Sequence, residues 1–149
     1  MLRHLGEPVA ALREMRRVVR PGGSVVAAEP DWQGLRIDFP DAEAAALLVA
    51  RFAAGQRQAG IGLALHRYLA EAGLTERRTV GVLDVNTDFA VFAAYGLNMR
   101  PLAEELVAEG RLPRERAEAA LAHLSAASHD GTFYGYIAMF VAAGRVPAS

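Results

Sequence analysis

The feature that most limits how this chain can fold is a helix that ends at Pro-Gly-Gly and leads directly into an apolar segment. Before the turn, apolar residues recur at three- and four-residue spacing, as expected for an amphipathic helix with one buried face; they are Leu5, Val9, Leu12, Met15 and Val19. Pro21, Gly22 and Gly23 end this helix. The segment 24–28 has no polar alternation, which is typical of a strand covered on both faces. The unit therefore predicts an α/β fold.

The remainder of the chain predicts two more strands and several helices, punctuated by glycine and proline. Pro30 and Pro40 bracket an expected loop that contains Trp32. Asp41 is a suitable N-cap for the alanine-rich helix that follows it. We expect strands over 77–85 and 132–142, and helices over 42–54, 63–72, 88–95, 99–109 and 113–127. The sequence thus predicts one domain over 1–149, with a helical insertion at 88–127 before the final strand.

Composition narrows the possible functions. The formal net charge is −1, which gives no electrostatic footprint for nucleic acid or an anionic membrane. The chain has no cysteine, so disulfides and cysteine metal sites are excluded. His123 and His129 do not have the spacing of metal ligands on one helical face, so we expect no metal. No apolar run approaches the roughly 20 residues that span a bilayer, and we expect a cytoplasmic protein.

Three segments together resemble the class I S-adenosylmethionine-dependent methyltransferases. The first is "HLGEPVAALREMRRVVRPGGSVVAAEPDW", in which the Arg-Pro-Gly-Gly block is the most specific part. The second is "GLALHRYLAEAGL", and the third is "GTFYGYIAMFVAAGRVP". The resemblance covers nearly the whole chain, and it identifies these residues with the C-terminal half of the methyltransferase domain.

The resemblance implies a partial Rossmann-like sheet that consists of the last three strands of the family fold. In that fold the final strand is antiparallel and lies between the two strands that precede it. The glycine-rich cofactor loop and the acidic residue that binds the ribose are absent from this sequence. Gly60-Ile61-Gly62 is the only similar stretch, and it lies between expected helices rather than after a strand. The strand at 24–28 is left with an open edge, which is a liability for aggregation.

The same resemblance implies that the protein transfers a methyl group from S-adenosylmethionine to a small molecule. Arg3 and His4 match a family turn whose side chains flank the cofactor. Because the cofactor loop is missing, this chain alone is expected to be a truncated form that binds the cofactor poorly or not at all. The alternative is a non-catalytic methyltransferase-like module that forms a homodimer or complements a separate N-terminal half.

Two carboxylates and an indole follow the first expected strand. Ligands of open α/β sheets bind outside the carboxyl ends of the strands, where we place Glu29, Asp31 and Trp32. Methyl transfer requires alignment and sometimes a base, so Glu29 and Asp31 are the candidate catalytic residues. Trp32 is a candidate substrate contact. The alternatives are a solvated loop, a helix cap and, for the indole, simple packing.

The helical insertion is the expected substrate lid, because long insertions on a scaffold often determine specificity. Phe92 and Tyr95 belong to its apolar lining and are candidate substrate contacts, which suggests an apolar metabolite. Tyr134 alternates with Phe133 in the expected final strand and is a further candidate. The alternative for these aromatic residues is packing in the core.

Overall fold

The computed structural model describes residues 1–94 and 96–148, and the chain divides into two compact units. The first unit comprises Met1–Gly34, Gln56–Leu83 and Ala138–Ser149. The second comprises Leu35–Gly55 and Asp84–Ile137.

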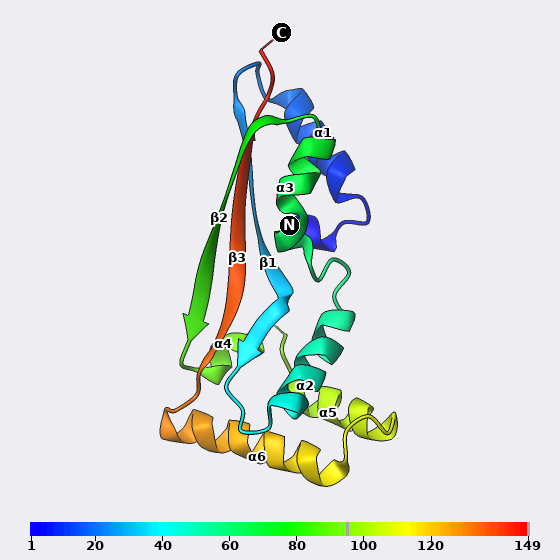
Figure 1. The fold of residues 1–149 in the computed structure, drawn as a ribbon, viewed down its shortest axis with the longest axis vertical. Coiled ribbons are helices and arrows are strands. Elements are labelled where there is room, and N and C mark those ends of the chain that lie inside the picture. The colour runs from blue at the N-terminus through cyan, green and yellow to red at the C-terminus, as the bar shows by residue number, and fades with distance from the viewer. Residues whose placement is uncertain (95, 149) are drawn as a thin grey trace. The chain divides into compact units, whose positions relative to one another are not determined.

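The described residues form one three-stranded sheet with the order β1-β3-β2 (Figure 1). Its strands are β1 (Ser24–Ile37), β2 (Thr75–Asn86) and β3 (Gly135–Arg145). At one end Asp38 donates its backbone N–H to Tyr134 O, and at the other Val146 donates to Gly23 O, so β3 runs antiparallel to β1. The predicted α/β class is confirmed, and the final strand lies between the other two as the resemblance implied.

The first unit contains the 3₁₀ helix η1 (Leu2–His4) and the helices α1 (Pro8–Val18) and α3 (Ile61–Glu71). α1 and α3 pack against each other on the same side of the strands (Figure 1). Their apolar faces and the strands share one core, which contains Leu2, Leu12, Val25, Ala27, Ile61, Leu65, Leu69, Ala72, Leu74, Ala142 and Val146. After α3 the chain turns at Gly73, whose φ of 77° is left-handed and favours glycine.

The second unit is built mainly from helices α2 (Ala42–Ala54), α4 (Phe89–Ala94), α5 (Met99–Ala108) and α6 (Arg114–Asp130). The predicted cap is confirmed, because Asp41 Oδ1 accepts a hydrogen bond of 3.0 Å from Ala44 N. α2 packs against both α5 and α6. The helices of the expected lid therefore belong to the same compact unit as α2.

Strand β1 corrects two predictions. The expected loop after residue 28 is wrong, because β1 continues through Pro30, Asp31 and Trp32. The backbone N–H of Trp32 donates to Ala59 O, which lies outside the sheet. Because the backbone nitrogens of residues two apart point to the same side of a strand, the nitrogen of Pro30 also points away from β3. A proline on that side of an edge strand removes no ladder hydrogen bond.

The expectation that this strand is covered on both faces is also wrong. Val25 and Ala27 are buried, whereas Val26 is 60% exposed and Ala28 is exposed. The reason is that α1 and α3 lie on the same face of the sheet in the first unit.

The final strand begins later than predicted. Helix α6 continues through His129 and Asp130, beyond the predicted end at residue 127, and is closed by Gly131 with a φ of 68°. Thr132 N and Phe133 N then donate to Ala127 O and close the helix terminus. Phe133 and Tyr134 therefore precede β3 rather than alternate within it.

Candidate functional site

The candidate catalytic residue Glu29 lies in the middle of β1, under η1. Its side chain is directed into the core and the residue is only 2% exposed. Oε1 accepts hydrogen bonds from the terminal amine of Met1 at 2.6 Å and from Leu2 N at 2.5 Å. Oε2 has no hydrogen-bond partner among the described residues. Glu29 thus fastens η1 to the sheet and does not stand at a solvent-filled rim, which corrects the predicted placement.

The alternation of side chains along β1 indicates that Glu29 is buried. Side chains of alternate residues share one face of a strand, so Glu29 shares its face with Val25 and Ala27. Both of these neighbours are buried. If the strand is extended past its predicted end at residue 28, the alternation of its side chains places the Glu29 carboxylate on the core face.

Three of the other predicted residues gather around η1. Trp32 is 3% exposed, and the guanidinium carbon of Arg3 lies 5.8 Å from the centre of its indole ring, which is a cation–π geometry. Arg3 Nε donates to His4 Nε2 at 3.0 Å, and His4 is exposed. η1 therefore brings the candidate cofactor residues Arg3 and His4 close to Glu29 and Trp32.

The second candidate carboxylate, Asp31, is half-buried in the same strand. Its Oδ1 is buried and has no hydrogen-bond partner among the described residues. Its Oδ2 folds back over Gly34, where an added Cβ would stand 2.7 Å away. Of the two predicted carboxylates, Asp31 is the one that no backbone N–H or amine is seen to hold.

The Gly60–Gly62 stretch has a packing role. It lies at the start of α3, where a Cβ on Gly62 would stand 2.8 Å from Glu29 O and 2.9 Å from Pro30 O. A Cβ on Gly60 would stand 2.7 Å from the side-chain oxygen of Gln33. Gly62 lets α3 approach the backbone of β1, and Gly60 makes room for the Gln33 side chain, so packing accounts for both glycines without a bound nucleotide.

The candidate substrate residues of the second unit differ in how far they are exposed to solvent. Phe92 is fully buried, and its ring meets that of Phe133 edge-on at 5.7 Å and 73°. Leu97 and Met99 of the same insertion are buried as well. Tyr134 is 47% exposed and accepts a backbone hydrogen bond from Asp38. Tyr95 lies outside the described residues.

One charged cluster of the second unit was not predicted. Arg116 in α6 donates two hydrogen bonds of 2.7 Å to the carboxylate of Asp41 and one of 2.9 Å to Glu43. The two bonds from Arg116 to Asp41, with the one from Ala44 N, lower the pKa of Asp41 from 3.8 to about 2. The carboxylates in turn raise the pKa of Arg116. The cluster joins the first turn of α2 to α6, across 75 residues of sequence that no local pattern spans.

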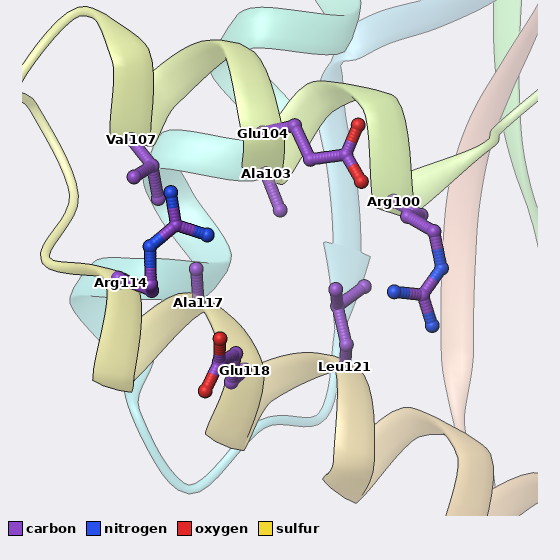
Figure 2. Close-up of a pocket in the computed structure, with 8 residues that line it drawn as sticks. All are labelled: Arg100, Ala103, Glu104, Val107, Arg114, Ala117, Glu118 and Leu121. Carbon is purple, nitrogen blue, oxygen red and sulfur yellow. The ribbon is translucent and has the colours of Figure 1, made fainter.

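A shallow groove lies between α5 and α6 (Figure 2). Its apolar residues are Ala103, Val107, Ala117 and Leu121, and its charged residues are Arg100, Glu104, Arg114 and Glu118. All four charged residues are exposed. Because no buried polar side chain lines the groove, it offers a ligand no fixed contact, and the cluster around η1 remains the candidate site.

Neither a cluster of metal ligands nor a membrane-spanning helix is found among the described residues. No three histidine, aspartate or glutamate side chains within residues 1–94 and 96–148 come together as metal ligands would. In the same part of the chain, every helix is too short or too polar to cross a membrane.

No protein-family model matches the chain. The chain is similar to an uncharacterized 37.1 kDa protein in transposon TN4556 of Streptomyces fradiae, with 35% identity over 143 residues. The match covers 95% of this chain and 40% of that protein. The chain thus spans about two fifths of the length of the relative it matches.

Proposed function

We propose that this chain is part of an S-adenosylmethionine-dependent methyltransferase that acts on a small, apolar metabolite. The observation that carries the proposal is the strand order. β3 runs antiparallel between β1 and β2, which is the order implied by the resemblance for the last three strands of that fold. This order is not the commonest one, because strands that follow each other in sequence are neighbours in a sheet roughly two-thirds of the time.

The residues of this chain do not fit the cofactor by themselves. A nucleoside needs accessible acceptors for its hydroxyls, yet Glu29 is buried and its Oε1 already accepts from Met1 and Leu2. Arg3 lies over Trp32, which leaves His4 as the exposed polar group of the cluster. The cofactor contacts therefore belong to another segment.

Within this proposal, the chain supplies one wall of the domain and a candidate group for the substrate. Asp31 is the better candidate of the two carboxylates, because its Oδ1 has no hydrogen-bond partner among the described residues. As a carboxylate it would accept a proton from, or orient, the methyl acceptor. The segment that binds the cofactor would add to the open edge of β1, next to these residues.

The longer Streptomyces fradiae relative allows a direct test. Titration calorimetry with S-adenosylmethionine would be run on this chain, on the whole relative, and on this chain mixed with the remainder of the relative. We expect binding by the whole relative and none by this chain alone, with binding restored in the mixture if the pieces complement each other. A folded relative that binds neither S-adenosylmethionine nor S-adenosylhomocysteine would refute the proposal.

A second candidate function is a non-catalytic methyltransferase-like module. The burial of Glu29 under η1 favours it, because the carboxylate is then a structural anchor rather than a catalytic group. The same titration separates the two candidates. A relative that complements this chain into a stable complex without binding the cofactor would support the module.

A further inference from the structure

Strand β2 is an exposed edge with an apolar surface. It lies at the end of the order β1-β3-β2, so one of its edges has no neighbouring strand among the described residues. Val80 is 59% exposed, Val82 56%, Leu83 58% and Val85 45%. Edge strands of monomeric proteins are usually shortened, bulged or interrupted by proline. β2 runs for 12 residues without a proline, and its residue with a left-handed φ, Glu76 at 46°, lies near its start and outside the segment 78–84. Such an edge is suited to pairing with another strand.

The other edge of the sheet differs in this respect. β1 carries Pro30, and the N–H of Trp32 already donates to Ala59 O. These features obstruct part of the β1 edge, which is also the edge that the proposed function assigns to the cofactor-binding segment. An inference about β2 is therefore independent of the proposed function.

The two faces of β2 are distinguishable from their contacts. Thr79 Oγ1 lies 3.0 Å from His66 Nδ1 of α3, and Gly81 faces the ring of Phe140, a member of the core on that side. Alternation then places Arg78, Val80, Val82 and Asp84 on the face opposite α3. That face of β2 carries an apolar pair flanked by an arginine and an aspartate.

We propose that β2 pairs antiparallel with β2 of a second copy of this chain, about a two-fold axis at Gly81. A two-fold axis between antiparallel strands stands perpendicular to the sheet, so residues pair only with residues on the same face. Centring at Gly81 sets Arg78 opposite Asp84 of the second copy, and Val80 opposite its Val82. The two-fold axis makes each of these pairs occur twice in the dimer, once on either side of Gly81.

The neighbouring registers are less complementary. Centring at Val80 would set Glu76 opposite Asp84, which are like charges. Centring at Val82 would set Val80 opposite Asp84 and leave Arg78 opposite Asn86. The Asp84 carboxylate accepts from Asn86 at 3.2 Å, and a carboxylate has acceptor sites beyond one such bond. Charge complementarity therefore selects the register at Gly81.

Cysteine cross-linking tests this register directly, because the chain has no cysteine of its own. Residues directly opposite each other in an antiparallel pair have Cα atoms about 4.5–5.5 Å apart, within disulfide range. Gly81→Cys would place two thiols opposite each other, and an added Cβ there has room at 3.4 Å from Phe140. Leu83→Cys is the matched control on the same face, because its two copies would lie about 13 Å apart along the strands.

Charge exchange is the second test. Sedimentation should show a dimer for the native chain and a roughly tenfold weaker dimer for Arg78→Asp, since two ion pairs become two repulsive pairs. The double variant Arg78→Asp/Asp84→Arg should regain the native dissociation constant, which a folding defect would not. Arg17→Asp, on the exposed side of α1, is the control for the charge change itself.

The expected result is a dimer that cross-links through Gly81→Cys and much less through Leu83→Cys. A dimer that cross-links equally at both positions, or that Arg78→Asp leaves unchanged, uses a different surface. If the native chain is monomeric, β2 does not pair with a second copy, and its edge is then available to a different protein or to another segment of a longer chain. Each of these results would overturn the proposal.

Discussion

Replacing Gly62 by alanine tests the close contact that builds the candidate site. A Cβ at this position would stand 2.8 Å from Glu29 O and 2.9 Å from the carbonyl carbon and oxygen of Pro30. These are backbone atoms of β1, so no side-chain rotation can relieve the overlap, and either α3 or β1 must move. Overpacking of this kind costs about 1–3 kcal/mol, and a rigid neighbour favours the upper end.

The better helix propensity of alanine offsets part of this cost. Gly62 is the second residue of α3, where the exchange gains at most about 1 kcal/mol. We therefore expect the free energy of unfolding to fall by about 2 kcal/mol, which for a chain of this size lowers Tm by roughly 4–8 °C.

The single tryptophan provides the assay. Trp32 is buried in the first unit, so its fluorescence during urea unfolding reports on the unit that contains Gly62. Gly6→Ala is the matched control, because a Cβ there meets only the end of the Arg57 side chain at 3.6 Å. If Gly62→Ala unfolds at the same urea concentration as Gly6→Ala, the close approach of α3 to β1 is refuted.

Three further predictions concern the other contacts described above. The pKa of Asp41 is lowered to about 2, so the stabilisation by Arg116 is complete above pH 3.8 and is lost as the pH falls toward 2; helical circular dichroism should show this acid transition, and Arg116→Gln should flatten it, whereas equal acid curves would contradict the pairing. Glu29→Gln should lower the free energy of unfolding by about 1–3 kcal/mol in the same fluorescence assay, because the bonds from the Met1 amine and Leu2 N then no longer go to a charged acceptor; an unchanged urea midpoint would show that these bonds do not stabilise the first unit. Phe92→Ala should cost about 3–5 kcal/mol in thermal unfolding, since its ring is fully buried; a loss no larger than that of Val18→Ala, at a site 70% exposed, would argue against its place in the core.

The elements that could be predicted from the sequence are those specified by local chemistry. The Asp41 cap, the left-handed glycine after α3 and the helical period of α1 each depend on neighbours within a few residues. The central position of β3 is different, because it followed from a resemblance and not from periodicity. Local signals alone would have left the strand order open.

The features that could not be predicted depend on contacts between distant residues. Pro30 continues a strand because β1 is an edge, and only the sheet order reveals that edge. Leu2 N contacts Glu29 across 27 residues, and Arg116 contacts Asp41 across 75. A carboxylate after an apolar strand is typical both of a catalytic rim and of a buried anchor, and the choice between them depends on what η1 covers.

The obstruction of the β1 edge sets an upper limit on the length of any strand that can be added there. Pro30 has no N–H to offer, and the N–H of Trp32 is already used by Ala59. The free stretch runs from Ser24 to Glu29, which at about 3.3 Å per residue is roughly 20 Å. A synthetic peptide that mimics the complementing strand should therefore gain affinity with each added residue up to this length and none beyond it.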